Sequence, residues 1–400
     1  MENIEKKEND KIQIVCDPYE ENVEYSYEIN KNNYLANAFI VNGRFGPVSS
    51  FYKVKTDKLV AIKKISNAYE NPTKGKNVLK QLSILSFINH PNIIKLLDII
   101  IPEKEDYNNI YLIEEYMGSN LERLIVSDYY DYKKDEKLIP WIIYQILEGI
   151  HYLHSCKIMH RNIKCSNILI DEKANIKICG FGNAISFNDY ENTFRGETND
   201  FISEKGILTY QAPEILASKK KNKNNYDEKI DLWGVGCIMA ELYTKIIPFF
   251  PSLKNNKIKW VSQLNGIFKK LGKPSKEEIQ KFASKERAKD INKFHSFQRM
   301  DKKELFPNVN DENVLDLIEK LLCINPKERI SLKEAINHPY FDVIKEFKYL
   351  DDFVDSNKIF INEYEQKIEE MEKRNALFNE QILFYKNEIF SKKKNFYINV

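Results

Sequence analysis

The hydrophobic period changes once along this 400-residue chain, near residue 135. Before that point, short β-rich runs alternate with turn residues, as in KLVAIKKI at 58–65 and NIYLIEEY at 109–116. One stretch among them, GKNVLKQLSILSFI at 75–88, has the apolar spacing of a helix. After residue 135, the amphipathic run LIPWIIYQILEGIHYLHSC at 138–156 begins a segment in which helices dominate. The pattern predicts an α+β chain, with a small β-rich lobe followed by a larger helical lobe.

Three segments outside this pattern carry expectations of their own. Residues 1–33 are polar and charged and are expected to form a loose N-terminal arm, and the polar residues 254–310 are expected to be semi-regular. Residues 356–392 hold an unbroken a/d heptad series, with Asn375 at an a position, where a polar residue sets register and oligomer state. Two interpretations stay open for this C-terminal helix: it packs on its own domain, or it forms a coiled coil.

Composition excludes several classes of protein. The 61 Lys+Arg and 59 Asp+Glu residues give a net charge of +2, so no global field favours nucleic acid or an anionic membrane as partner. No apolar run approaches the ~18 residues of a membrane span, and the charged start MENIEKKEND lacks the apolar stretch of a signal peptide. The six cysteines are scattered without a CxxC pair. A zinc site is therefore not expected. The cysteine pattern favours an intracellular location, in the cytoplasm or the nucleus.

Short motifs follow one another in a fixed order through the middle of the chain. They are VAIK at 60–63, HRN at 160–162 followed by Asn167, GFG at 180–182, APE at 212–214, DLWGVGC at 231–237 and Arg329. With these motifs, residues 34–345 resemble a eukaryotic protein kinase domain, which implies a bilobal fold with a β-rich N-lobe and a helical C-lobe. NHPNIIKLLDII at 89–100 and GIFKKLGKPSKEE at 266–278 resemble the cyclin-dependent kinase branch.

The resemblance implies a site for ATP. In the family, a glycine loop, the VAIK lysine, the hinge strand and the catalytic loop contact the nucleotide. The matching positions here are Val41, Gly43, Gly46, Val48, Ala61, Lys63, Glu115, Met117, Lys164, Asn167 and Leu169. Val41 stands where the first glycine of the loop belongs, and its β-branched side chain restricts the backbone there.

Three positions of the resemblance lack the charged group that the chemistry uses. Asn162 replaces the aspartate that accepts the substrate proton, and general-base help is worth ~10²–10⁴ in rate. Gly180 replaces the aspartate that anchors Mg²⁺, which leaves Asn167 as a weak ligand. Gln81 replaces the glutamate that pairs with Lys63 in the family. Its amide can form a hydrogen bond with Lys63 but cannot neutralise the positive charge. No catalytic residue is therefore expected to be intact, and no metal site is expected.

Glu114 adds a charge at a position that is usually apolar in the family. A carboxylate there is costly unless it is paired, and Lys63 has lost its usual partner. One interpretation is a Glu114–Lys63 pair at the back of the nucleotide pocket. The other is a one-residue shift of the alignment that turns Glu114 outward.

These losses leave several functions open. The leading interpretation is a pseudokinase, acting as scaffold or allosteric partner, that binds ATP without Mg²⁺ or binds no cofactor. Its partners would be proteins, either a cyclin-like protein or the partner of the C-terminal coiled coil, which includes a second copy of the chain. The alternatives are a weakly active, atypical ATP-dependent Ser/Thr kinase and a module that binds nucleotide without transferring phosphate.

Overall fold

The computed structural model describes residues 11–17, 20–43, 46–68, 70, 72–101, 109–127, 134–187, 208–218, 226–252, 259–347 and 386–387. These residues divide into two compact units, an N-terminal unit built from residues 11–89 and 94–116 and a helical unit built from residues 90–93 and 117–347. The C-terminal helix expected at 356–392 lies outside the described residues except for Lys386 and Asn387. Within the described ranges, no helix has both the length and the apolar character that crossing a membrane requires.

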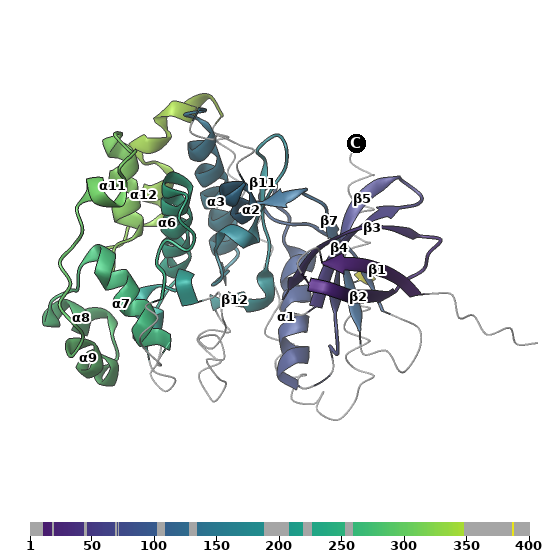
Figure 1. Cartoon of the computed structure of the whole chain (residues 1–400), viewed down its shortest axis with the longest axis horizontal. Coiled ribbons are helices and arrows are strands. Elements are labelled where there is room, and N and C mark those ends of the chain that lie inside the picture. Colours follow the sequence, from purple (N-terminus) through teal and green to yellow (C-terminus); the bar gives the residue numbers. More distant parts are fainter. Residues whose placement is uncertain are drawn as a thin grey trace, which may run out of the picture. The chain divides into compact units, whose positions relative to one another are not determined.

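The N-terminal unit holds a five-stranded antiparallel sheet in the order β3-β4-β5-β7-β6, a two-stranded hairpin and one helix (Figure 1). The sheet strands are β3 (Tyr34–Gly43), β4 (Gly46–Lys53), β5 (Lys58–Ile65), β6 (Leu96–Ile100) and β7 (Ile110–Glu115). The helix α1 spans Pro72–Phe87, close to the range that its apolar spacing predicts.

The hairpin shows that the expectation of a loose N-terminal arm is wrong for residues 11–28. Its strands are β1 (Lys11–Asp17) and β2 (Glu20–Glu28), paired antiparallel. Tyr27 is fully buried in a cluster with Phe51 and Tyr111 on one face of the sheet. Tyr25, Tyr27 and Ile29 alternate with polar residues, which is the period of a half-buried strand. The high charge of the segment conceals this alternation.

The helical unit is built around two long helices that lie side by side, α3 (Leu138–Ser155) and α6 (Lys229–Thr244) (Figure 1). Every residue of α6 from Ile230 to Leu242 is buried, so this helix forms the centre of the unit. The other α-helices are α2 (Leu121–Val126), α5 (Pro213–Leu216), α7 (Lys259–Leu271), α8 (Lys276–Phe282), α9 (Lys285–Asn292), α10 (Lys302–Leu305), α11 (Glu312–Leu321) and α12 (Leu332–Ile336).

Short strands and 3₁₀ turns complete the helical unit. A three-stranded sheet has the order β11-β10-β8, and β9 pairs with β12. The strands are β8 (Ser119–Asn120), β9 (Ile158–Met159), β10 (Ile168–Ile170), β11 (Ile176–Ile178) and β12 (Ile185–Ser186). The 3₁₀ helices are η1 (Cys165–Asn167), η2 (Phe181–Asn183), η5 (Leu208–Tyr210) and η6 (Pro339–Phe347). A sheet in one unit and helices in the other confirm the expected α+β class.

Residues 254–310 are more regular than their polar composition suggests, since helices α7 to α10 fall within the described part of this range. Ser275 and Glu278 form a reciprocal capping box at the start of α8, and Ser284 caps α9. Helix α8 buries only Ile279 and Phe282. Such short helices carry too few apolar residues for periodicity to reveal them, and their caps are the clearer signal.

Candidate functional site

Sheet register places several of the predicted residues of the N-terminal unit on one face. Ala61 pairs with Glu114, and Lys63, two residues along β5, pairs with Val48 on β4 and Leu112 on β7. Cross-strand partners share a face and residues two apart share it too. Ala61, Lys63, Val48 and Glu114 therefore lie together, opposite the face that the hairpin covers.

Glu114 lies on the same face of the sheet as Lys63 and is close enough for the charge of Lys63 to act on its carboxyl, which agrees with the first of the two interpretations without showing an ion pair. Burial raises the pKa of the Glu114 carboxyl, the charge of Lys63 opposes that rise, and Glu115 adds to it. The alternating register turns Glu115 to the other face, where its Oε1 accepts a 2.7 Å hydrogen bond from the Lys95 amide. The interpretation in which Glu114 points outward is wrong, because the register and the shared field with Lys63 agree.

Gln81 does not take the role that its position in α1 suggested. Gln81 is only 2% exposed, and its Oε1 has no hydrogen-bond partner in the described chain. Lys63 therefore does not donate to Gln81 Oε1, so the hydrogen bond that this residue could offer is not made within the described chain. The positive charge of Lys63 faces a carboxylate on the sheet, Glu114, instead of one on the helix.

Two of the predicted glycines lie at the facing ends of β3 and β4. Gly43 pairs with Gly46, and Val41 pairs with Val48. Gly46 has φ +140°, and a Cβ there would meet the Lys64 carbonyl oxygen at 2.4 Å. A glycine is therefore required at 46, whereas Val41 is 47% exposed and fits without strain.

Three further predicted nucleotide residues, Glu115, Met117 and Leu169, lie in or next to strands. Glu115 ends β7, and the Met117 carbonyl accepts a 2.9 Å hydrogen bond from the Ser119 amide. Leu169 lies at the middle of β10, paired with Lys177 on β11 and with Asn120 on β8. Glu115 and Leu169 thus lie in strands, and Met117 lies in the short connection between β7 and β8.

In the helical unit, Asp231 holds the loop that carries HRN. Its carboxylate accepts from the backbone amides of His160 (2.9 Å) and Arg161 (2.7 Å) and from His154 Nε2 (3.0 Å). Burial raises the pKa of Asp231, but His154 and the amide donors outweigh it, so the pKa lies below its usual value. The loop is therefore rigidly placed by an ionised, buried carboxylate.

His160 acts as a structural residue within this loop. Burial is the main cause that lowers the pKa of its imidazole, which is therefore neutral. Its Nε2 lies 3.0 Å from the Cys179 carbonyl and donates to it, and its Nδ1 accepts from the Asn162 amide at 3.3 Å. Its ring contacts Phe181 edge-on, with centroids 4.9 Å apart. His160 thus links the HRN loop to the GFG turn.

Asn167 and Gly180 lie against each other. The Asn167 Nδ2 donates a 2.8 Å hydrogen bond to the Asn162 carbonyl, which fixes the side chain. Gly180 has φ +84°, and a Cβ built on it would meet the Cγ and Oδ1 of Asn167 at 2.7 Å. The space in which an aspartate side chain would begin is thus filled by Asn167, and this contact depends on glycine at 180.

These two positions do not fit Mg²⁺. The family would place the ion between Asn167 and the residue at 180, yet they provide one amide oxygen and no carboxylate. Mg²⁺ prefers carboxylates and phosphate oxygens in octahedral geometry. Elsewhere in the described ranges, no cluster of three or more His, Cys, Asp or Glu side chains could hold a metal ion.

The surroundings of Asn162 leave little room. A cavity of about 10 Å³ lies between Asn162, Tyr210 and Gln211 in the described part of the helical unit. That volume holds about one water molecule. Lys164, two residues along the loop, is half-buried, and its carbonyl accepts from the Asn167 amide at 2.9 Å.

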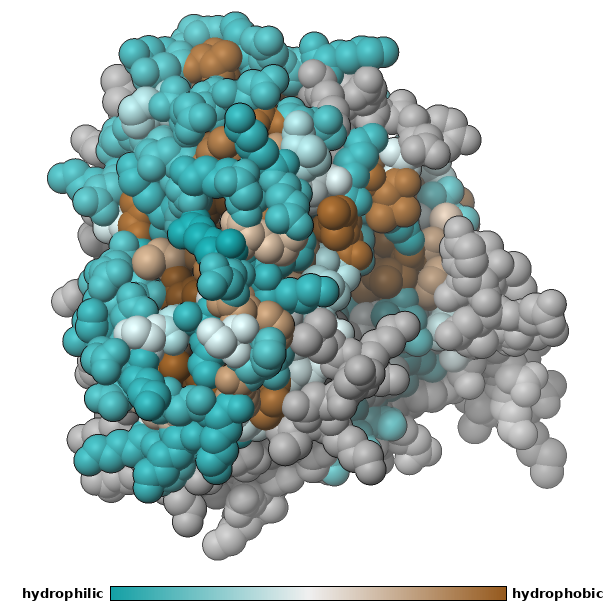
Figure 2. Space-filling model, turned by 60° about the vertical axis from the view of Figure 1, so that its left-hand side comes forward, coloured by the Kyte–Doolittle hydropathy of each residue, from teal (hydrophilic) through white to brown (hydrophobic). Residues whose placement is uncertain are grey.

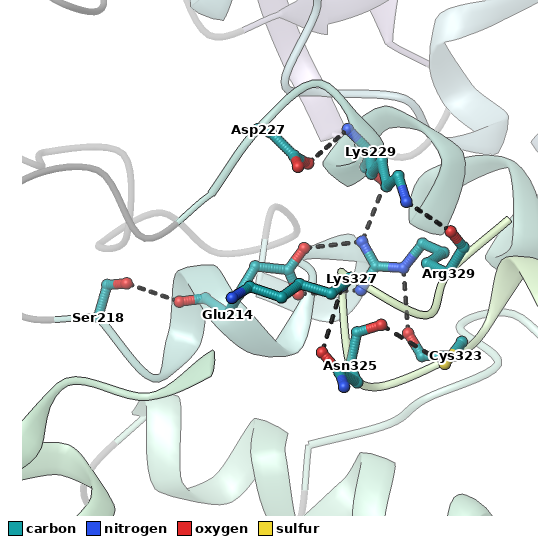
Figure 3. Close-up of polar contacts among 8 residues, drawn as sticks. All are labelled: Glu214, Ser218, Asp227, Lys229, Cys323, Asn325, Lys327 and Arg329. Carbon is teal, nitrogen blue, oxygen red and sulfur yellow. Dashed lines mark hydrogen bonds and ion pairs between the residues drawn. The ribbon is translucent and has the colours of Figure 1, made fainter. Parts of the chain in front are cut away.

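The packing of the helical unit rests on a buried ion pair (Figure 3). Arg329 donates to both carboxylate oxygens of Glu214, at 2.7 and 2.9 Å, and both side chains are 0% exposed. The same guanidinium donates to the carbonyls of Cys323 and Lys229. This network ties the APE motif to α6 and to the loop before α12.

Sequence reasoning missed a buried cluster beneath the HRN loop. Glu241 on α6 is 1% exposed and accepts hydrogen bonds from Tyr210 Oη (2.7 Å), Cys165 Sγ (3.0 Å) and the Phe249 amide (3.0 Å). Burial raises the pKa of Glu241 to about 7. The available signal was a second carboxylate, after Asp231, in the otherwise apolar run IDLWGVGCIMAELYT.

Comparison with known proteins agrees with the motifs at the level of family. The sequence model of the protein kinase domain matches residues 34–341. The chain is 32% identical over 349 residues to mitogen-activated protein kinase 5 of Oryza sativa subsp. indica, covering 86% of this chain and 87% of that protein. It is 33% identical over 310 residues to mitogen-activated protein kinase 13 of Arabidopsis thaliana, covering 77% and 79%.

A further relative, mitogen-activated protein kinase 10 of Arabidopsis thaliana, is 34% identical over 304 residues, which is 75% of this chain and 71% of that protein. These names are those of mitogen-activated protein kinases, so the matches do not support the cyclin-dependent branch that the motifs at 89–100 and 266–278 suggested. The bilobal architecture and the ordered motifs nevertheless agree with the matched domain. The chain belongs to the protein kinase family.

Proposed function

We propose that the chain is a pseudokinase: a protein kinase fold that acts on protein partners by binding, with its phosphoryl-transfer chemistry lost. The observation that carries this proposal is the contact between Asn167 and Gly180. A side chain that could hold the metal ion is absent at 180, and the remaining ligand, Asn167, is hydrogen-bonded to the Asn162 carbonyl. The base position is itself an amide.

The parts that keep the fold together support the same proposal. Asp231 accepts hydrogen bonds from two backbone amides, and Arg329 donates hydrogen bonds to both carboxylate oxygens of Glu214. Breaking a buried pair such as the latter costs about 3–5 kcal/mol, so these residues maintain stability independently of catalysis. A fold that keeps its structural charges and loses its chemical ones fits a binding role.

The alternative is a weakly active Ser/Thr kinase that binds ATP. Lys63, the residue that would contact phosphates, is kept, and it lies on the same face of the sheet as Glu114. Under this alternative, another carboxylate or the nucleotide alone would have to place Mg²⁺. Under the leading proposal, ATP binds without Mg²⁺ or does not bind.

The partners that we propose are proteins. A coiled coil over 356–392 would join two copies or bind another helix, supported by the a/d series and by Asn375 at an a position. A cyclin-like partner is the weaker case, because it rests on the branch that the relatives do not name. The location that we propose is intracellular, in the cytoplasm or the nucleus, from the scattered cysteines.

Thermal unfolding with ATP, with and without Mg²⁺, tests the proposal. A ligand at 100 times its Kd stabilises by about 2.7 kcal/mol, which is readily detected. At a fixed ATP concentration, we expect Mg²⁺ to leave the unfolding temperature of the wild type unchanged. We expect the same absence of a Mg²⁺ effect in Lys63→Ala. The Lys63→Ala variant serves as the control for binding through the phosphates.

A Mg²⁺-dependent rise in unfolding temperature that disappears in Lys63→Ala would contradict the proposal. Transfer of ³²P from ATP to a general protein substrate, lost in the same variant, would establish the kinase alternative. If ATP stabilises without Mg²⁺ and no phosphate is transferred, the chain is a nucleotide-binding pseudokinase.

A further inference from the structure

A cavity in the described part of the helical unit lies apart from the motifs VAIK, HRN, GFG and APE. Its volume is about 380 Å³. It is lined by residues from the end of α7, from α8, from the loop before α10, from α10, from α11 and from the segment that follows α11. Figure 2 brings these helices forward and shows hydrophobic side chains in recesses of a largely hydrophilic face.

The interior of the cavity is apolar and held by packed helices. Five apolar lining residues are each at most 8% exposed: Phe282 from α8, Leu305 from α10, Phe306 directly after α10, and Leu315 and Ile318 from α11. Backbone hydrogen bonds close the side formed by the loop, from the Lys273 amide to Phe297 O at 2.9 Å and from the Met300 amide to Lys270 O at 3.1 Å. The cavity is thus a defined feature of the unit.

One edge of the cavity carries more positive than negative charge. Arg299 and Lys302 both pair with Glu319, Lys302 at 2.7 Å. The two cationic side chains are 54% and 45% exposed, whereas Glu319 is 28% exposed. The N–H donors of an arginine and a lysine outnumber the acceptor positions of one carboxylate. A second anionic group can therefore bind at this edge without displacing Glu319.

The other charged groups of the lining already serve the fold. Lys273 Nζ donates to the carbonyls of Asn292 (3.1 Å) and Phe294 (2.7 Å). Glu278 closes the capping box of α8, and Glu328 accepts from Asn325 at 2.6 Å. The Arg299–Lys302 edge is thus the part of the rim with donors to spare.

We propose that this cavity, defined here as the α7–α11 pocket, binds a compact small molecule with an apolar body and one anionic group. The volume lies at the lower end of the about 300–1,000 Å³ that small-molecule sites span, which fits one ring system or one short chain. The apolar body would fill the space beside Leu315 and Ile318, and the anionic group would pair with Arg299 and Lys302. The proposal is independent of the nucleotide site and of the proposed function.

Two fluorescent probes that differ in one group test the charge requirement. 8-Anilinonaphthalene-1-sulfonate has an aromatic body and one sulfonate, and N-phenyl-1-naphthylamine has the same body without it. Both are titrated into the full chain. We expect saturable binding of one sulfonate probe per chain and weaker binding of the neutral probe, by about fivefold, since charge-assisted hydrogen bonds are the stronger ones.

Variants assign the binding to this cavity. Leu315→Trp fills the cavity and is expected to weaken both probes by at least about tenfold, since the aromatic body loses its space. Lys302→Gln is expected to remove the preference for the sulfonate and to leave the neutral probe unchanged. Lys303→Gln is the matched control, because Lys303 is the exposed neighbour on α10 and does not line the pocket.

The thiol of Cys323 provides a readout at the site itself. Cys323 lines the cavity and is half-buried, and Cys156 on the same unit lies outside it. We expect the sulfonate probe to slow alkylation of Cys323 by N-ethylmaleimide, followed by mass spectrometry, and to leave Cys156 unaffected. Equal binding of the two probes, full binding to Leu315→Trp, or an unchanged rate at Cys323 would each overturn the proposal.

Discussion

Among single residues, Gly180 shows how two positions can lose their chemistry together. Its φ of +84° is a conformation that asparagine and aspartate tolerate better than most side chains. The obstacle to aspartate is Asn167, whose side chain fills the space beside the Gly180 Cα and is held by the Asn162 carbonyl. Loss of the carboxylate at 180 and the new contact of Asn167 therefore depend on each other.

Gly180→Asp is accordingly expected to leave the protein without Mg²⁺-dependent stabilisation by ATP. The new side chain must displace Asn167, which costs its hydrogen bond to Asn162, about 1 kcal/mol. Urea unfolding measures that loss, and thermal unfolding with ATP measures any gained metal dependence. Gly182→Asp in the same turn is the control for an added charge. A Mg²⁺ response in Gly180→Asp alone would show that Asn167 moves aside readily.

Glu114 offers a second test at residue scale. Its carboxylate attracts Lys63, and a phosphate would have to compete for the same ammonium group. We expect Glu114→Gln to tighten ATP binding about threefold or more, within the range of partly exposed ion pairs. Isothermal titration calorimetry gives the Kd directly. Glu115→Gln, on the opposite face of the same strand, should leave it unchanged, and equal effects of the two variants would exclude the Lys63–Glu114 interaction.

At the scale of elements, sequence patterns predicted what hydrophobic spacing or motifs mark. The strand that carries VAIK, the helix at 75–88 and the long helix at 138–156 lie where their residues indicated. Patterns failed where polar residues dominate, as in the hairpin around Tyr27 and in α8, whose capping box is the clearer signal. The contact of Asn167 with Gly180 could not be predicted, because spacing along the chain carries no distance between two loops.

The contribution of the hairpin β1–β2 to the free energy of unfolding can be measured. Tyr27 is 0% exposed against Phe51 and Tyr111, and its hydroxyl donates to Ser49 Oγ at 2.9 Å. Tyr27→Ala is expected to lower the free energy of unfolding by about 3–5 kcal/mol. Tyr52→Ala, at a tyrosine that is 37% exposed on β4, should cost less than about 1 kcal/mol. Urea unfolding measures both losses. If Tyr27→Ala lost as little stability as is expected for Tyr52→Ala, the packing of the hairpin on the sheet would not contribute to stability.

The cluster around Glu241 joins η1, η5 and α6, so its ionisation acts on three elements. The folded carboxyl has a pKa of about 7 and the ordinary value is 4.5. Between these values the folded chain holds a proton that the unfolded chain releases, so stability falls as the pH rises from about 4.5 to 7. The full difference corresponds to about 3 kcal/mol. Below about pH 4.5 this contribution is constant.

Glu241→Gln is expected to remove this pH dependence. The amide oxygen can accept from the Phe249 amide, and the amide NH2 can donate to the Tyr210 hydroxyl. The glutamine does not ionise, so the unfolding free energy of the variant should change less between pH 5 and pH 7. Urea unfolding at several pH values measures the slope. Glu228→Gln, at an exposed carboxylate before the same helix, is the control. Parallel slopes in Glu241→Gln and the wild type would refute the role of Glu241.

For the whole molecule, oligomeric state decides whether a pseudokinase can connect partners through its C-terminal segment. The a/d series from Ile361 to Ile389 predicts a coiled coil, and these positions lie outside the described residues. We expect the full chain to sediment as a dimer and a chain ending at residue 347 to sediment as a monomer. Asn375→Ile should strengthen association and admit higher oligomers, because a polar a position restricts both. A monomeric full chain at micromolar concentration would leave packing on its own domain as the interpretation of residues 356–392.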